Sequence, residues 1–180
     1  MYYFILTEEQ TMKTLYISDL DGTLLDGNAE ITPYTRDVIN AFTSSGGFFT
    51  VATARTEATV KYILQGLDLN VPAVLMNGVT CYDMKTGKHI MPRYMPKEGV
   101  RAIIDVVEKR RCTGFIYSLK NNTLTITYKW LETPQAKAFV EERRIKYGKV
   151  FTQVENFDTE GVLTFCTMGK RSSSTPLPKL

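Results

Sequence analysis

The sequence has little cysteine and almost no histidine, with three Cys and one His in 180 residues. Its cysteines are widely spaced, form no C-x-x-C pair, and are Cys81, Cys112 and Cys166. This pattern argues against structural disulfides and a zinc site, and it favours reduced thiols in a cytoplasmic protein. The single histidine, His89, excludes a metal site built from several histidines.

Long apolar runs and a strong charge of either sign are absent too. No apolar run approaches the roughly 18 residues that span a bilayer, and MYYFILTEEQ lacks the basic flank and cleavage site of a signal peptide. A net charge of +3 is too small to imply a nucleic-acid partner. The basic residues of EKRRC and EERRIKYGK stand beside acidic ones on predicted helices, which is typical of a solvated surface. We therefore expect neither a membrane nor a nucleic-acid partner.

What is present is the composition of a soluble globular protein, 43% apolar and 23% charged. The length suits one domain, or one domain and part of another. Changes of pattern predict four segments: an N-terminal extension at 1–11, a first unit at 12–85, a second unit at 86–170, and a disordered tail at 171–180.

The first unit alternates short β-rich runs with helical patterns. The runs LYIS, FFTVAT and PAVLMNG predict strands. Between them, Thr32 and Pro33 are typical of a helix start, and Val60, Ile63 and Leu64 form the apolar stripe of a second helix. This order predicts an α/β unit with a parallel sheet whose strands are buried on both faces.

The second unit has a different pattern. A hairpin is predicted to turn at Thr86–Gly87 and another at Asn121–Asn122. KEGVRAIIDVVEKRR is an amphipathic helix, Thr133–Pro134 repeats the helix-start signal, and VLTFCTMG is a last strand. Helices beside antiparallel hairpins predict a small α+β module.

Polar side chains follow all three strands of the first unit. Asp19 and Asp21 follow the first strand, Thr53 the second and Asn77 the third. In an open parallel sheet, ligands bind outside the carboxyl ends of the strands, and helix N-termini there favour an anion. The sequence therefore predicts a phosphate site at this edge.

The aspartates have the chemistry for phosphoryl transfer. Asp19 is placed to attack phosphorus as a nucleophile, and Asp21 to protonate the leaving oxygen and then activate water. Mg²⁺ prefers carboxylate oxygens and would neutralise the phosphate. Gly22 lets the backbone turn closely round the phosphate, and the Thr23 hydroxyl can tie the loop to itself.

The D-x-D-G pattern has two other interpretations. Counted from Asp19, Glu30 falls at position twelve of a calcium-binding EF-hand loop. Position six is Leu24 rather than glycine, however, and a strand rather than a helix precedes the loop. A strand-to-helix turn without function is the other interpretation. An apolar strand ending in DLDGTLL is more specific than either.

The sequence resembles the haloacid dehalogenase (HAD) superfamily. DLDGTLLD is similar to its first motif, TVATAR to its second, and VLMNG to the strand-end Asn-Gly of the Cof-type phosphatases. The resemblance covers roughly residues 12–170, although Ala54 replaces a usual glycine. It implies a three-layer Rossmann-like core with a parallel sheet, incomplete here, followed by part of an α+β cap of the C2 type.

The resemblance also implies roles for individual residues. Asp19 corresponds to the nucleophile and a Mg²⁺ ligand, and Asp21 to the acid/base whose backbone carbonyl contacts the metal. Thr53 corresponds to the hydroxyl that holds the phosphoryl group. Arg55 and the Asn77–Gly78 pair match positions on the substrate side, although an ordinary surface role for Arg55 and a capping role for Asn77 remain alternatives. The implied substrates are small phosphorylated metabolites such as sugar phosphates.

Two later motifs of the family have no counterpart. No Gly-Asp dipeptide occurs in the sequence, and Lys170 follows a predicted cap strand, which is the wrong place for the motif lysine. The sequence thus suggests a chain truncated within the cap, with weak or no phosphatase activity. Uncovered edges of its core or cap could promote self-association. Two alternatives stay open: a non-catalytic remnant that binds phosphate or a protein, and a sugar phosphomutase.

Overall fold

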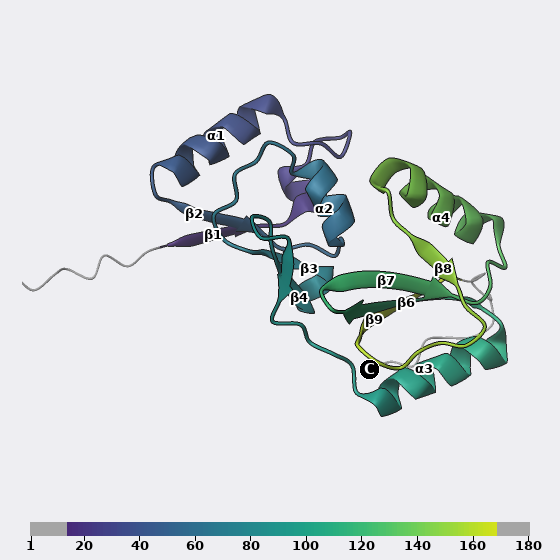
Figure 1. Ribbon diagram of the computed structural model, residues 1–180. Coiled ribbons are helices and arrows are strands. Elements are labelled where there is room, and N and C mark those ends of the chain that lie inside the picture. The colour runs from purple at the N-terminus through teal and green to yellow at the C-terminus, as the bar shows by residue number, and fades with distance from the viewer. Residues whose placement is uncertain (1–13, 169–180) are drawn as a thin grey trace, which may run out of the picture.

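The computed structural model describes residues 14–168. The predictions for the extension at 1–11 and the tail at 171–180 lie outside these residues. The chain forms two lobes (Figure 1). The first holds β1 to β5 with α1 and α2, and the second holds β6 to β9 with α3 and α4. Within the described residues, no helix combines the length and apolar character needed to cross a membrane.

The first lobe begins with the predicted β-α-β unit. β1 (Leu15–Ser18) pairs in parallel with β2 (Phe48–Val51), and α1 (Pro33–Ser44) connects them. The helix starts where the sequence predicts, because the Thr32 hydroxyl accepts a hydrogen bond from the Thr35 amide at 3.1 Å. This bond satisfies one of the free N–H groups of the first turn.

The third strand is joined to the sheet more loosely. α2 (Glu57–Ile63) leads to β3 (Ala73–Leu75), which meets β2 through one parallel bridge between Ala52 and Val74. A hydrogen bond from the Thr53 amide to the Val74 carbonyl, 2.9 Å long, extends this contact. The strand ends of β2 and β3 are therefore adjacent.

A hairpin extends the sheet beyond β3. β4 (Thr80–Asp83) pairs antiparallel with β3, and β5 (Lys88–Ile90) pairs antiparallel with β4. Gly87 takes the left-handed conformation, with φ of 68°, at the predicted turn. This hairpin crosses the predicted boundary at 85/86, so β5 lies with the strands of the first lobe; the boundary between domains remains a prediction.

β1 is not buried on both faces, and that prediction is wrong for this strand. Leu15 is 42% exposed, and Tyr16 and Ile17 are each 55% exposed. Among residues 14–168, β2 is the strand that pairs with β1, and the other edge of β1 carries no strand. The parallel-sheet pattern needs covering elements on both sides, and the described residues do not supply them.

The second lobe is a four-stranded sheet with order β8-β7-β6-β9. Asn121 and Asn122, both left-handed, turn the predicted hairpin between β6 and β7. β8, a three-residue strand parallel to β7, was not predicted from the sequence. The elements are α3 (Lys97–Arg110), β6 (Thr113–Lys120), β7 (Thr123–Tyr128), α4 (Pro134–Tyr147), β8 (Phe151–Gln153) and β9 (Val162–Met168).

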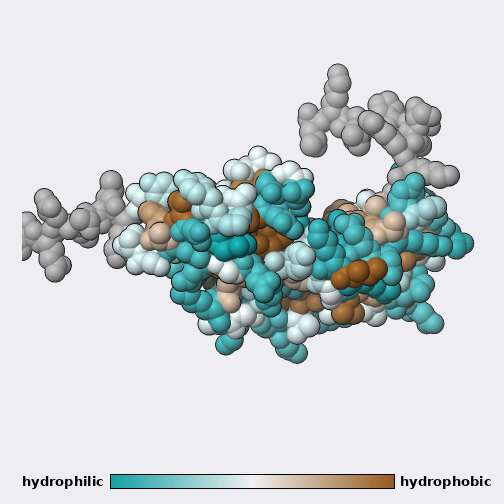
Figure 2. Space-filling model, turned by 90° about the horizontal axis from the view of Figure 1, so that it is seen from above, coloured by the Kyte–Doolittle hydropathy of each residue, from teal (hydrophilic) through white to brown (hydrophobic). Residues whose placement is uncertain are grey.

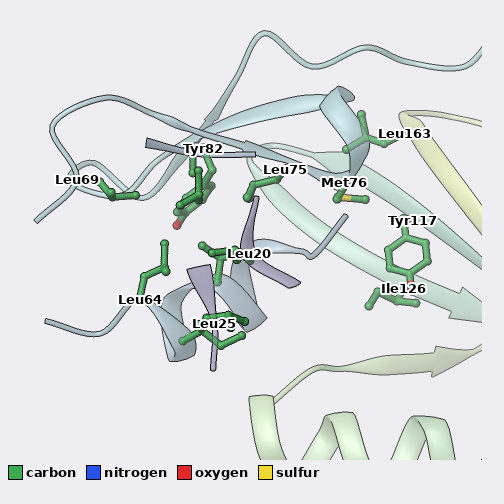
Figure 3. Close-up of a cluster of buried hydrophobic side chains, with 14 of the residues drawn as sticks. Leu20, Leu25, Leu64, Leu69, Leu75, Met76, Tyr82, Tyr117, Ile126 and Leu163 are labelled. Atoms are coloured by element: carbon green, nitrogen blue, oxygen red, sulfur yellow. The ribbon is translucent and has the colours of Figure 1, made fainter. Parts of the chain in front are cut away.

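One cluster of buried apolar side chains continues from the first lobe into the second (Figure 3). In the first lobe, Leu20 and Leu75 are fully buried, and in the second Leu163 is 1% exposed. Burial of such side chains contributes roughly 1.5–3 kcal/mol each. The shared core fixes the position of the second lobe relative to the first.

Above this core the lobes face each other across a cleft. The rings of Tyr62 on α2 and Tyr147 on α4 pack edge to face, with centroids 5.5 Å apart. In the space-filling view a notch separates the two lobes on this side (Figure 2). The cleft lies beside the strand ends of the first lobe, where the sequence predicts the site.

Candidate active site

The loop after β1 places both aspartates on the surface. Leu20 between them is fully buried, while Asp19 and Asp21 are exposed. The Asp19 carboxylate accepts a hydrogen bond of 2.7 Å from the Leu20 amide, and the Leu25 amide closes the loop on the Leu20 carbonyl at 3.0 Å. Leu20 thus acts as an apolar anchor that turns both carboxylates outward.

Glycine is required at the next position. Gly22 has φ of 74°, in the left-handed region where side chains with a Cβ are strained. It lies in the loop with the exposed Thr23, for which the structure gives no hydroxyl hydrogen bond. The tie that the sequence analysis expected from Thr23 therefore stays a prediction.

The structure brings the predicted residues of three strand ends round one hollow of about 540 Å³. Asp19 and Asp21 line it from the loop after β1, Thr53 from the end of β2, and Asn77 and Gly78 from the turn after β3. Gly22 and Thr23 do not line it, and Arg55 lines the adjoining cleft.

Backbone hydrogen bonds hold two of these segments together. The Asn77 amide donates to the Thr53 carbonyl at 3.1 Å, and the Met76 amide donates to the Arg55 carbonyl at 3.2 Å. Met76, Asn77 and Gly78 all have positive φ, between 54° and 88°. The Thr53 hydroxyl is buried and accepts from the Arg55 amide at 3.2 Å. The backbone here is strained and fixed, which is common at functional sites.

Arg55 and Asp21 form a bidentate ion pair. The Arg55 Nε lies 2.9 Å from Asp21 Oδ2, and Nη2 lies 2.6 Å from Oδ1. The hydrogen bond from the guanidinium lowers the pKa of Asp21 below its usual range, and the same bond raises the pKa of Arg55. In this arrangement Asp21 is ionised, with both oxygens occupied.

The residues described provide only part of a metal site. Asp19 offers carboxylate oxygens and Asp21 a backbone carbonyl, and both are the hard oxygen donors that Mg²⁺ prefers. Within residues 14–168 there is no group of three His, Cys, Asp or Glu side chains that could hold a metal ion. The donors present fit Mg²⁺ in kind, and water would have to fill most positions.

Beside the hollow lies a cleft of about 560 Å³ between the lobes. One wall comes from the first lobe, including Asp21, Arg55 and Asn77. The other comes from the second lobe, mainly from one face of α4 that presents Phe139, Glu142, Arg143, Lys146 and Tyr147. The rest of this wall is formed by Tyr117, Lys149, Thr164, Phe165 and Cys166. The two cavities share three residues, Asp21, Ala54 and Asn77, and so adjoin each other.

This wall was not predicted from the sequence. The pattern of EERRIKYGK is typical of a solvated surface, but Arg143, Lys146 and Lys149 from this stretch line the cleft. The signal was present as the spacing of Phe139, Arg143 and Tyr147 on one helix face. What the sequence did not show is which lobe that face would meet.

Buried charges continue from the cleft to the base of α2. Burial lowers the pKa of Lys149 to about 8, with Arg143 adding to the effect and Glu57 opposing it. Burial also raises the pKa of Glu57. The His89 ring nitrogen Nε2 lies 3.7 Å from Glu57, and burial lowers the pKa of His89. His89 lies on β5 and takes no part in lining the hollow.

A family model for haloacid dehalogenase-like hydrolases matches residues 16–174, nearly the whole chain. The chain belongs to this family. The resemblance found in the sequence is thereby confirmed, while the assignment of the two lobes to a core and a cap stays a prediction. Asp19 and Asp21 lie within the matched region, at the end of its first strand.

Curated relatives of this HAD protein are phosphatases. Over 108 residues it is 33% identical to the 5-amino-6-(5-phospho-D-ribitylamino)uracil phosphatase YwtE of Bacillus subtilis, covering 59% of this chain and 36% of the relative. Over 99 residues it is 25% identical to the pyridoxal phosphate phosphatase YbhA of Escherichia coli, covering 55% and 36%. The chain thus spans about a third of the length of these relatives.

Solved structures show the same fold. A haloacid dehalogenase-like hydrolase from Bacteroides thetaiotaomicron superposes with a TM-score of 0.68 at 16% identity, covering 87% of this chain and 58% of that one. The HAD subclass IIB sugar phosphatase BT4131 superposes with a TM-score of 0.58 at 20% identity, covering 78% of this chain and 53% of that one. At these identities the likeness establishes the α/β fold predicted from the sequence, including its Rossmann-like core.

Proposed function

We propose that this site hydrolyses phosphate monoesters of small metabolites, such as sugar phosphates, through an aspartyl-phosphate. The observation that carries the proposal is the convergence of Asp19, Asp21, Thr53 and Asn77 on one hollow at the strand ends. Such a set combines a nucleophile, an acid/base and phosphate-binding groups. Its phosphatase relatives favour the same chemistry.

The reaction proceeds in two displacements. A carboxylate oxygen of Asp19 attacks phosphorus, the bond from phosphorus to the ester oxygen breaks, and Asp21, which has taken up a proton after its release from Arg55, gives that proton to the ester oxygen. Water then attacks the phosphoryl group and gives a proton to Asp21. The bond between phosphorus and Asp19 breaks, which releases inorganic phosphate and restores both aspartates.

Other residues of the hollow position the phosphate. The Thr53 hydroxyl and the side-chain amide of Asn77 hold phosphoryl oxygens, and Gly78 and Gly22 allow the backbone to approach closely. Thr23 supports the loop. Arg55 has a further task, because Asp21 can act as an acid only when its oxygens are released. We assign Arg55 to the substrate phosphate, so that binding of substrate draws it from Asp21.

Mg²⁺ is the cofactor that the donor types support. Asp19 through its carboxylate and Asp21 through its carbonyl would hold it, with waters completing the shell. When bound, it neutralises charge on the phosphoryl oxygens. Because the 180-residue sequence lacks a Gly-Asp motif and a motif lysine, we expect this chain to turn over far more slowly than HAD phosphatases with both. The three free thiols fit a cytoplasmic location.

Substitution of the nucleophile tests the proposal. Asp19→Asn should abolish the Mg²⁺-dependent release of phosphate from p-nitrophenyl phosphate, because an amide does not attack phosphorus. Asp37→Asn is the matched control, since Asp37 is exposed on α1 away from the hollow, and its activity should equal that of the wild type. Wild-type protein quenched in acid should carry one phosphoryl group on Asp19 by mass spectrometry.

Other results would contradict the proposed hydrolysis or favour one of the two alternative functions. Activity retained in Asp19→Asn would contradict the mechanism. A wild-type protein that binds phosphate or a protein partner without turnover, and keeps that partner in Asp19→Asn, would be a non-catalytic binding module. A sugar phosphomutase would move phosphate to a second hydroxyl of the sugar, which product analysis separates from hydrolysis.

A further inference from the structure

The cleft holds an excess of positive charge. Two of its cationic side chains have carboxylate partners: Arg55 pairs with Asp21, and Arg143 Nη1 lies 3.0 Å from Glu142 Oε2. The charged residues that line it are Arg55, Arg143, Lys146 and Lys149 on the basic side, and Asp21 and Glu142 on the acidic side. Once these pairs are counted, two ammonium groups are left over.

Those ammonium groups belong to Lys146 and Lys149. Among residues 14–168, neither has a carboxylate oxygen within 4.0 Å. Lys146 lies on the cleft face of α4, and Lys149 follows the helix C-cap, Gly148. Lys149 is partly buried; Arg143 and Arg55 repel it, and the Glu57 carboxylate, which lies beyond ion-pair distance, attracts it. A bound anion would relieve that repulsion, and water alone would not.

The position of these lysines relates them to a substrate in the hollow. The hollow at Asp19 and the cleft share Asp21, Ala54 and Asn77 as walls. A phosphate held by the hollow therefore directs the rest of its molecule, the leaving group, into the cleft. Lys146 and Lys149 then face the leaving group from the opposite lobe.

We propose that Lys149, with Lys146 beside it, binds a second anionic group, a carboxylate or phosphate, on the leaving group of the substrate. This inference rests on the proposed function and narrows its substrate class to doubly anionic phosphate monoesters. Charge-assisted contacts in a partly desolvated cleft are stronger than those at an open surface. The first lobe thus binds the phosphate that is transferred, and α4 selects the molecule that carries it.

Paired ligands test the inference on the full chain. Isothermal titration calorimetry in Mg²⁺ buffer compares 3-phosphoglycerate with glycerol 3-phosphate, which has a hydroxymethyl group in place of the carboxylate. Fructose 1,6-bisphosphate and fructose 6-phosphate form the pair for a second phosphate. The wild type should bind the doubly anionic member of at least one pair about tenfold more tightly, a difference of about 1.4 kcal/mol.

Variants assign that preference to the cleft. Lys149→Gln and the double variant Lys149→Gln/Lys146→Gln should reduce it to less than about threefold, while binding of the singly anionic member changes less than about twofold. Lys137→Gln is the control, because Lys137 is exposed on α4 and does not line the cleft. It removes the same charge from the same helix and should keep the preference.

The outcomes separate this inference from the proposed function. If the wild type binds glycerol 3-phosphate and hydrolyses p-nitrophenyl phosphate but shows no preference in either pair, the inference is wrong and the function stands. A preference that survives in the double variant also overturns it. If p-nitrophenyl phosphate is untouched but the lysine-dependent preference is present, the anion site stands without the phosphatase. No binding of any ligand contradicts both.

Discussion

At the scale of single residues, the site is a balance of charges held at close range. Arg55 donates hydrogen bonds to both carboxylate oxygens of Asp21, and Glu142 forms an ion pair with Arg143. Lys149 is partly buried, and the repulsion from Arg143 and Arg55 is only partly offset by Glu57. Groups kept in such unfavourable surroundings commonly serve binding rather than stability. The loss in the free energy of unfolding that such a group causes can be measured in the protein without ligand.

We predict that Lys149→Met stabilises the fold near pH 7. The folded-state pKa of Lys149, about 8, lies below the ordinary value of 10.5. At pH 7 the folded chain must hold the ammonium in a site that disfavours it, and removing it should raise the free energy of unfolding by about 2 kcal/mol. Urea unfolding of both proteins at pH 7 measures the difference.

The pH dependence of that difference has a defined sign. Between pH 8 and pH 10.5 the unfolded chain binds more protons at Lys149 than the folded chain does. The stability of the wild type relative to Lys149→Met therefore rises with pH across this window. The difference in free energy of unfolding between the two proteins should nearly disappear by about pH 10.5. A gap that stayed constant from pH 7 to pH 10 would contradict the assigned pKa.

At the scale of elements, α4 is the structural unit that carries the cleft wall. The Thr133 hydroxyl accepts a hydrogen bond from the Ala136 amide at 3.1 Å, and Gly148 ends the helix in the left-handed conformation. Ala136 and Val140, on the side of the helix next to the cleft face, are buried. The caps and this buried side together decide how the cleft face is presented.

Removal of the N-terminal cap of α4 should lower stability. We predict that Thr133→Ala reduces the free energy of unfolding by about 1 kcal/mol, because the Ala136 amide loses its acceptor. Thr133→Ser keeps the hydroxyl and should lie within about 0.5 kcal/mol of the wild type. Chemical denaturation monitored by circular dichroism gives both values. Equal losses in the two variants would show that the methyl group, not the cap, matters.

Elements set by local signals could be predicted from the sequence, and those set by distant contacts could not. The Thr32 and Thr133 caps and the turns at Gly87 and Asn121–Asn122 act within a few residues, so their patterns located helices and hairpins correctly. β8 has only three residues and exists because β7 pairs with it. No local pattern marks such a strand.

The same division applies to the site. D-L-D-G located the loop, because burial of Leu20 and the positive φ of Gly22 are local requirements. The grouping of Thr53 and Asn77 with it followed from the rule for parallel sheets. Two features depend on tertiary packing and have no local signal. They are the bidentate contact of Arg55 with Asp21 and the position of Lys149, from the second lobe, in the cleft.

At the scale of the whole molecule, β1 leaves an apolar edge open within the described residues. Tyr16 and Ile17 are each 55% exposed there, and Tyr16 has the Phe42 ring as its aromatic neighbour. Unpaired N–H and C=O groups on an edge of this kind are a template for pairing with another chain. The open edge gives the predicted self-association a definite location.

We predict that the purified 180-residue chain associates with itself as its concentration rises, and that Ile17→Lys suppresses this association. A charge on an edge strand opposes strand pairing between molecules. Ile145→Lys is the control, because Ile145 is 77% exposed on α4, outside the cleft face. Size-exclusion chromatography with light scattering should show association in the wild type and in Ile145→Lys but not in Ile17→Lys. A monomer at all concentrations would contradict the prediction.

The contact between the lobes also bears on how such a protein can change through evolution. The backbone hydrogen bonds that join the Thr53 and Asn77 segments belong entirely to the first lobe. The charged wall of the cleft belongs to α4, from Phe139 to Tyr147. Under the proposed function, replacing side chains on that helix face would alter which molecule is accepted and would leave the bond-breaking geometry intact. New substrates would then require only a few mutations on the helix surface, without the loss of function that changes at the strand ends would bring.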